Sequence, residues 1–302
     1  MEKKISKESN LHARNKNRNG YDLDALVLLL PELKDYIILN KYGSKTVDFA
    51  NPKAVKLLNK ALLIQNYDIQ FWEFPAENLC PPIPGRADYL HYVADLLKEN
   101  NFGRMPNKGN ITALDIGTGA SCIYPIIGVA EYSWDFIATD TDSKSLESAA
   151  KIIKNNTILE DKVQLRLQGN SNHIFTGILE NNEKIDICIC NPPFHESEEA
   201  AEKASRRKLI NLSTEKVENF ALNFSGNSQE LIYPGGEIQF IENMIRESKI
   251  YAKNIGWFTT LVSKNSNLSR IYKLLDKISA TQIETIDMGT GNKQTRIVAW
   301  KF

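Results

Sequence analysis

The feature that most constrains this chain is a short apolar run that ends at two consecutive prolines. The run Ile185–Cys190 alternates Ile with Asp or Cys, and Pro192 and Pro193 follow after one asparagine. Alternation without a helical stripe predicts a short buried strand. Each proline lacks a backbone N–H and fixes φ, so the strand must stop there. Open α/β sheets bind ligands at the carboxyl ends of their strands, which makes this rigid turn a candidate site.

The turn itself predicts a type of ligand. The Asn191 amide offers one hydrogen-bond acceptor, the Pro192 carbonyl offers a second, and Phe194 offers a flat apolar face. A planar ring that bears an exocyclic amino group would suit all three. We therefore expect Asn191, Pro192, Pro193 and Phe194 to form a catalytic turn.

A second motif lies upstream, where the apolar stretch 111–116 runs into the turn Gly117-Thr118-Gly119. Glycine lets the backbone adopt positive φ and approach a ligand closely. A dinucleotide-binding motif would have a further glycine where Cys122 stands. The sequence therefore predicts a close ligand contact at this turn but no pyrophosphate cradle.

Two acidic residues accompany the glycine turn. The stretch 134–139 is predicted to be a second strand, and it ends at Asp140, roughly twenty residues after the glycines. A carboxylate there can accept both ribose hydroxyls of an adenosine-type cofactor. Asp115, just before the glycines, would lie near a cationic part of the ligand. A cofactor with a positive sulfonium centre fits these carboxylates better than one that carries pyrophosphate.

Taken in order, these stretches resemble a known family. Residues 113–121, 134–140 and 185–194 are similar to the first, second and fourth motifs of class I methyltransferases that depend on S-adenosylmethionine. The fourth motif is of the amino-methylating type. Leu11–Asn15 and Cys80–Tyr89 extend the resemblance to the RlmF family of bacterial 23S ribosomal RNA adenine-N6 methyltransferases. The resemblance covers nearly the whole chain from about Leu11.

The resemblance implies a Rossmann-like α/β fold with a seven-stranded, mostly parallel sheet, one antiparallel edge strand and a mainly helical N-terminal module. It implies methyl transfer from S-adenosylmethionine to the N6 amine of an adenine in 23S ribosomal RNA, either free or in a large-subunit assembly intermediate. Arg86 is expected at the cofactor carboxylate and Asn170 at the cofactor adenine. The expected cofactor-binding residues are Arg86, Asp115, Gly117, Gly119, Ser121, Asp140 and Asn170.

The chain divides into three predicted parts. Residues 1–20 are expected to be a basic flexible tail, and residues 21–104 a mainly helical module that caps the cofactor and contacts RNA. Residues 105–302 are expected to form the methyltransferase domain, in which strands and helices alternate. Within it, the segment 195–235 is too long for an ordinary connection, so we expect a substrate lid. The predicted strands lie near 111–116, 134–139, 162–167, 185–190, 255–262, 282–288 and 295–301.

The charge of the chain is balanced, with 37 lysines and arginines against 37 aspartates and glutamates. A net charge of zero argues against a protein that coats nucleic acid by bulk electrostatics. Local clusters of basic residues nevertheless suit phosphate contacts. The expected RNA contacts are Arg14, Lys16, Arg18 and Arg296.

The sequence also predicts a cytoplasmic protein with no membrane span and no metal site. No stretch approaches about 20 uninterrupted apolar residues, and no apolar run follows the first charges as in a secretory signal. The four cysteines lack the paired spacing of a zinc site. Cys188 and Cys190 are expected to be core thiols in a reducing compartment.

Other functions stay open at this point. Guanine-N2 methylation of ribosomal RNA also uses this tetrapeptide followed by His, and only Leu11–Asn15 and Cys80–Tyr89 favour adenine. Protein glutamine-N5 methylation is possible, although those enzymes generally have Tyr where Phe194 stands. A catalytically inert RNA-binding module is a further alternative, and the intact motifs argue against it. A nicotinamide dehydrogenase is another, and the missing third glycine argues against it.

Overall fold

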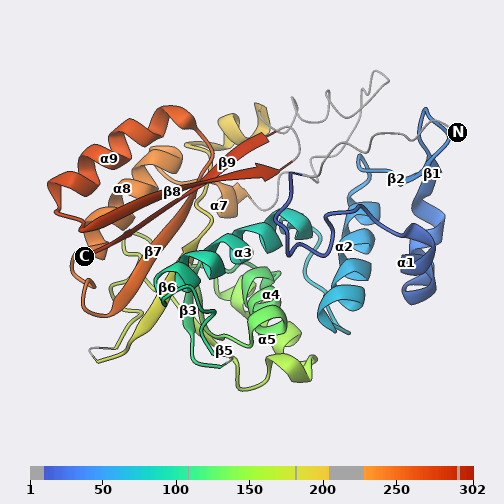
Figure 1. Ribbon diagram of the computed structural model, residues 1–302. Helices are drawn as coiled ribbons and strands as arrows, with labels where there is room; N and C mark the ends of the chain where they lie inside the picture. Colours follow the sequence, from blue (N-terminus) through green and yellow to red (C-terminus); the bar gives the residue numbers. More distant parts are fainter. Residues whose placement is uncertain (1–9, 108, 181, 204–227, 291–292) are drawn as a thin grey trace, which may run out of the picture.

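A seven-stranded sheet forms the centre of the computed structural model, which describes residues 10–107, 109–180, 182–203, 228–290 and 293–302 (Figure 1). Its strands are β3 (Thr112–Ile116), β4 (Asp135–Asp140), β5 (Val163–Leu167), β6 (Ile185–Cys190), β7 (Ile255–Val262), β8 (Gln282–Thr290) and β9 (Lys293–Lys301). Their order in the sheet is β5-β4-β3-β6-β7-β9-β8. All seven predicted strands are present.

The pairing directions confirm the predicted mostly parallel fold. Strands β3 to β7 pair in parallel, whereas β9 pairs antiparallel with both β7 and β8. The antiparallel strand thus lies next to the edge, between β7 and the outermost strand β8. The predicted hairpin turn between β8 and β9 includes residues 291–292, which lie outside the described residues.

The two faces of the sheet carry separate apolar clusters, because side chains alternate along each strand. In β6, Ile187 and Ile189 belong to one cluster, and Cys188 and Cys190 belong to the other. Helices from different parts of the chain bury the two faces (Figure 1). The first cluster includes α2 (Pro52–Tyr67), α3 (Ile83–Glu99) and α4 (Ile123–Tyr132), and the second includes α8 (Gly236–Ser248) and α9 (Leu268–Lys277).

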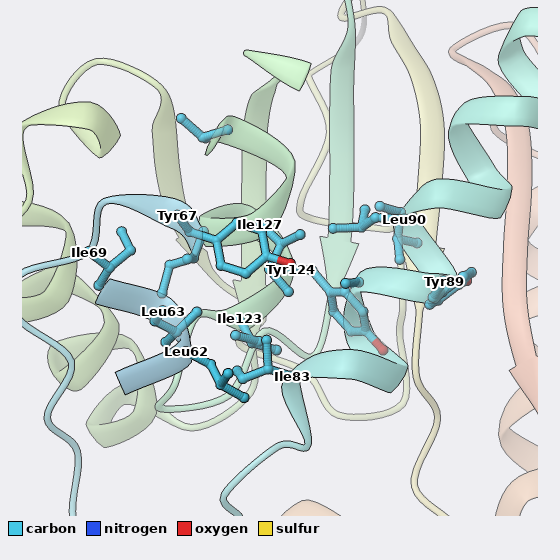
Figure 2. Close-up of a cluster of buried hydrophobic side chains, with 14 of the residues drawn as sticks. Leu62, Leu63, Tyr67, Ile69, Ile83, Tyr89, Leu90, Ile123, Tyr124 and Ile127 are labelled. Carbon is cyan, nitrogen blue, oxygen red and sulfur yellow. The ribbon is translucent and has the colours of Figure 1, made fainter. Parts of the chain in front are cut away.

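The segment before the sheet shares the first of these clusters. Figure 2 shows Leu62 and Leu63 of α2, Leu90 of α3, and Ile123 and Ile127 of α4 in one group of buried side chains. The predicted boundary near residue 104 therefore separates two stretches of sequence but not two cores. The other elements are α1 (Leu23–Leu29), β1 (Ile37–Leu39), β2 (Lys45–Val47), α5 (Ser143–Lys154), α7 (Ser228–Leu231) and the short helical turns Pro31–Tyr36, Thr157–Leu159 and Asn265–Asn267.

Residues 10–20 are packed against the protein, so the prediction of a flexible tail is wrong for this segment. His12 and Asn15 are buried, and the His12 backbone N–H and the Asn15 amide both donate to the Asp88 carboxylate on α3. Asn15 also donates to the Pro84 carbonyl at 2.8 Å. A buried carboxylate needs donors, and this segment supplies them. The sequence of this segment is basic and polar, which suggested a flexible tail. Its partner Asp88 lies far away in the sequence, so the local pattern could not reveal the contact. Residues 1–9 of the predicted tail lie outside the described residues.

Two kinds of site are absent from the described residues. None of their helices is both long enough and apolar enough to cross a membrane. They also contain no group of three or more His, Cys, Asp or Glu side chains that could hold a metal ion. The four cysteines are free thiols, and Cys122, Cys188 and Cys190 are buried.

The contact between Asp88 and the N-terminal segment predicts a stability effect. We expect Asp88→Ala to lower the free energy of unfolding by about 1–3 kcal/mol, because the substitution leaves two buried N–H donors without an acceptor. Urea denaturation would measure the loss. The control is Asp276→Ala on the exposed side of α9, which we expect to change stability by less than about 0.5 kcal/mol. Equal losses in both variants would contradict the anchoring role of Asp88.

Candidate active site

A cavity of about 710 Å³ opens at the carboxyl ends of β3 and β6. The chain proceeds outward from β3 through β4 on one side and continues with β6 on the other, so the strand order reverses between β3 and β6. Open α/β sheets bind ligands at such a point. Small-molecule and cofactor sites typically have volumes of about 300–1,000 Å³, and this cavity lies in that range. Its wall brings together Arg86, Gly117, Gly119, Asp140 and Asn191.

The glycine turn presents bare backbone to the cavity. Gly117 has φ +75° and Gly119 has φ +64°, both in the left-handed region that favours glycine. A Cβ atom at either position would meet no atom of the described residues within 4 Å, so these residues leave open space in front of the turn. The N–H groups of Gly117 and Thr118 donate to the Thr139 carbonyl and tie the turn to the end of β4. This geometry would let a ligand approach the backbone closely.

Asp140 stands at the end of β4, beside the glycine turn. Its carboxylate accepts the backbone N–H of Gly119 at 2.9 Å and that of Asp142 at 3.0 Å. An ionised carboxylate has about four acceptor positions, so acceptor capacity remains for donors from a ligand. Burial raises the pKa of Asp140, and the backbone N–H groups oppose that increase. The residue can thus accept hydroxyl groups in the cavity.

Asp115 lies beneath the glycine turn rather than in the cavity wall. Its side chain is fully buried, and neither carboxylate oxygen has a hydrogen-bond partner among the described residues. Burial raises its pKa to about 7, and the nearby Asp140 carboxylate contributes to this increase. A cationic ligand above the turn would favour the ionised form of Asp115.

Arg86 enters the cavity from the first turn of α3. Its guanidinium donates to the Tyr124 hydroxyl at 3.1 Å and lies 5.6 Å from the centre of the Tyr124 ring. Ser121 also lines the cavity, and its carbonyl accepts the indole N–H of Trp72 at 2.9 Å. The structure therefore places predicted cofactor residues from three elements around one space.

The Asn191–Phe194 turn forms the wall on the β6 side. Asn191, Pro192, Pro193 and Phe194 all line the cavity. The Asn191 amide oxygen is buried and has no hydrogen-bond partner among the described residues. An acceptor in this state is unfavourable unless a ligand supplies a donor.

Asn170, the residue expected at the cofactor adenine, does not line the cavity. Its side chain is exposed, and its amide oxygen accepts the backbone N–H of Asn172, so it closes a local turn. Gln168, directly after β5, lines the cavity instead and donates to the Thr176 carbonyl. Gln168 is the first residue after the predicted strand 162–167, and this position could have identified it as a candidate for the cavity wall.

The predicted lid at 195–235 is described only at its two ends, because residues 204–227 lie outside the described residues. His195 and Ile232 form an isolated parallel bridge. Glu230 accepts hydrogen bonds from the Asn78 amide and the Leu79 backbone N–H, and burial raises its pKa. Glu230, Ile232 and Leu79 line the cavity. No sequence pattern pointed to Glu230, because its partners belong to a distant loop.

The comparisons with known proteins identify the family. A family model described as RNA methyltransferase matches residues 5–302. A Flavobacterium psychrophilum protein named Ribosomal RNA large subunit methyltransferase F is 51% identical, over 99% of this chain and 95% of that protein. The chain belongs to this RNA methyltransferase family. A Bacteroides thetaiotaomicron protein of the same name is 48% identical over 99% of both chains. The resemblance inferred from the motifs is confirmed.

The fold of this RNA methyltransferase matches that of a solved structure. The crystal structure of the human Mettl16 catalytic domain in complex with MAT2A 3′UTR hairpin 1 has a TM-score of 0.80 and 27% sequence identity. The match covers 97% of this chain and 95% of that one. The class I methyltransferase fold is thereby confirmed over almost the whole molecule.

The four basic residues expected to contact RNA lie in different surroundings. Arg14 bonds with Asp95 at 2.7 Å, and Lys16 pairs with Glu131 at 2.7 Å. Arg296 lies opposite Asp287 on the hairpin, and its side chain is only 12% exposed. Arg18 is exposed and has no side-chain partner among the described residues. The RNA contacts of this methyltransferase remain a prediction, and Arg18 is the most available of the four.

The buried carboxyl group of Asp115 predicts a pH effect. Its pKa increases from 3.8 to about 7 on folding, so the folded protein binds an extra proton between these values. This contribution to stability is therefore lost as the pH rises through that window. Asp115→Asn should become more stable relative to the wild type between about pH 5 and about pH 7.5, because asparagine cannot ionise. Urea denaturation at both pH values measures the difference, and an unchanged difference would contradict the assignment.

Proposed function

We propose that this chain transfers a methyl group from S-adenosylmethionine to the N6 amine of an adenine in 23S ribosomal RNA. The observation that carries the proposal is the buried amide oxygen of Asn191 in the cavity wall, which has no hydrogen-bond partner among the residues that the structure describes. The N6 amine of adenine offers two N–H donors, and the Pro192 carbonyl can accept the second. The name of the 51% identical relative, Ribosomal RNA large subunit methyltransferase F, supports ribosomal RNA as the substrate.

The residues on the β3 side of the cavity fit S-adenosylmethionine. When bound, the cofactor supplies a methyl group on a positively charged sulfur. Gly117 and Gly119, which leave open space in front of their backbone, suit its amino acid portion. Asp140 has acceptor positions left for the ribose hydroxyls, and Arg86 offers donors for the carboxylate. The buried carboxylate of Asp115 suits the cationic part of the cofactor.

The catalytic turn would act on the amine rather than on the cofactor. The lone pair of an adenine N6 is delocalised into the ring, which makes the amine a poor nucleophile. Asn191 and the Pro192 carbonyl would each accept one N6–H, favour a pyramidal nitrogen and free the lone pair. Phe194 would stack on the base, which contributes about 1–3 kcal/mol in aromatic stacking of this kind. The base must leave its stack to enter the cavity, so positioning would supply most of the acceleration.

The RNA partner would be 23S ribosomal RNA or a large-subunit assembly intermediate in the cytoplasm. Arg18, exposed at the surface, would contact phosphate, whereas Arg14 and Lys16 would first have to exchange their Asp95 and Glu131 partners for phosphate. The four free cysteines suit a reducing compartment. The described parts of 195–235 that line the cavity would cover the flipped base.

The experiment that tests this function identifies the product. Labelled S-adenosylmethionine is incubated with 23S ribosomal RNA that lacks the modification and with large-subunit precursors, and the nucleosides are resolved by mass spectrometry. We expect label in N6-methyladenosine. Label in N2-methylguanosine would replace the substrate assignment, and label in a protein glutamine would overturn the RNA proposal.

The role of Asn191 predicts a separation between turnover and binding. Asn191→Ala should reduce the methyl-transfer rate by at least about 100-fold, because the amine loses a positioned acceptor. The affinity for S-adenosylmethionine should remain within about twofold, because Asn191 is assigned to the substrate. Single-turnover kinetics and calorimetry measure these quantities. Asn155→Ala, at the exposed end of α5, is the control. Normal turnover in Asn191→Ala would remove this residue from the mechanism.

A further inference from the structure

A tyrosine hydroxyl from α3 lies between two strands of the sheet, directly behind the catalytic turn. Tyr89 and Thr259 are both fully buried. The backbone N–H of Cys190 donates to the Tyr89 hydroxyl at 3.2 Å, and the Tyr89 and Thr259 hydroxyl oxygens are 2.7 Å apart. The Thr259 hydroxyl donates to the Cys188 carbonyl at 2.7 Å. One chain of hydrogen bonds, in which each hydrogen is donated once, therefore joins the end of β6 to α3 and β7.

The hydroxyl groups of Tyr89 and Thr259 replace backbone hydrogen bonds between β6 and β7 at the end of β6. The register between β6 and β7 ends at Cys188 opposite Phe258, whereas the register between β3 and β6 continues to Cys190 opposite Ile116. The last residues of β6 are thus held by a ladder on the β3 side only. On the other side, the backbone N–H of Cys190 would lack a partner without Tyr89. Buried backbone groups are rarely left unpaired, which explains why a polar side chain is placed here.

We propose that Tyr89 and Thr259 are positioning residues that hold the end of β6, so that Asn191 presents its amide oxygen to the cavity. The proposal rests on the proposed function of Asn191. Neither hydroxyl residue is part of the cavity wall, so neither touches the substrate or the cofactor. Asn191 follows Cys190 directly, and Pro192 restricts the chain after it, so a shift of Cys190 is transmitted to the amide.

Helix α3 also connects Tyr89 to the side of the cavity that Arg86 lines. Arg86 and Tyr89 are three residues apart on α3, so they lie on one side of the helix. The Tyr89 ring packs edge-on against the Tyr124 ring, with centres 5.5 Å apart, and Tyr124 accepts the hydrogen bond from Arg86. Figure 2 shows Tyr89 on the far side of the cluster from Leu62 and Leu63 of α2. Tyr89 thereby sets the position of the amine acceptor relative to the cofactor-binding arginine.

The test removes one hydroxyl oxygen. Tyr89→Phe should lower kcat for methyl transfer by at least about tenfold, because a misplaced acceptor slows the reaction. The KM for RNA and the affinity for S-adenosylmethionine, measured by calorimetry, should stay within about twofold. The control is Tyr67→Phe, which alters a buried tyrosine of the same cluster whose hydroxyl has no partner among the described residues. This control should leave kcat within about twofold of the wild type. A Tyr89→Phe enzyme with normal kcat, or with cofactor affinity reduced as much as kcat, would overturn the proposal.

A second pair of variants covers the case in which Tyr89→Phe fails to fold. Thr259→Ser keeps the hydroxyl group and should retain kcat within about threefold, whereas Thr259→Val removes it and should lose at least about tenfold. Where both single variants fold, the effects of Tyr89→Phe and Thr259→Val on kcat should be non-additive, because Tyr89 and Thr259 share one hydrogen bond. Equal activity of the serine and valine variants would overturn the role of the hydroxyl chain.

One measurement is independent of methyl transfer. Amide hydrogen exchange of Cys190 should be at least about tenfold faster in Tyr89→Phe than in the wild type, and unchanged in Tyr67→Phe. If the wild type transfers no methyl group to any RNA, the proposed function fails, and this exchange result still decides whether Tyr89 holds β6. Unchanged exchange at Cys190 would overturn the positioning role even in an active enzyme.

Discussion

The parallel pairing of β3 with β6 is the contact on which the rest of the site depends. The ladder ends with Ile116 opposite Cys190, so the next residues on the two strands, Gly117 and Asn191, emerge side by side. Gly117 leaves its backbone open to the cavity, and Asn191 brings an acceptor that has no partner among the described residues. The reversal of strand order between these strands leaves the crevice in which both can act.

Helix α3 is the second element that organises the molecule. Arg86 in its first turn reaches the cavity, Asp88 binds the N-terminal segment, and Tyr89 reaches the strands β6 and β7. Because these residues lie within about one turn of a single helix, the N-terminal segment, the cavity wall and the end of β6 are linked mechanically. The early part of the chain therefore shares its core with the sheet, and Arg86 from this part lines the cavity.

The contrast between Asn170 and Gln168 shows how far local patterns define such a site. Both residues follow a strand that the sequence predicts correctly, and either could have faced a ligand. The Asn170 amide oxygen closes a local turn, whereas Gln168 lines the cavity. Arg14 illustrates the same limit, because its charge suggested RNA while Asp95, far away in the sequence, binds it. Glu230 could not be found at all, since both of its partners lie on a distant loop.

The sequence by itself determined the seven strands, the glycine turn after β3 and the proline-locked turn after β6. These features are local, because alternation, positive φ and the missing proline N–H act within a few residues. Only the tertiary structure decided which polar groups are satisfied inside the protein and which remain for a ligand. His12, Asp88 and Tyr89 find partners more than a strand or helix away, whereas the Asn191 oxygen finds none within the part of the chain that the structure describes. Burial and hydrogen-bond satisfaction depend on long-range packing, which no local pattern of residues encodes.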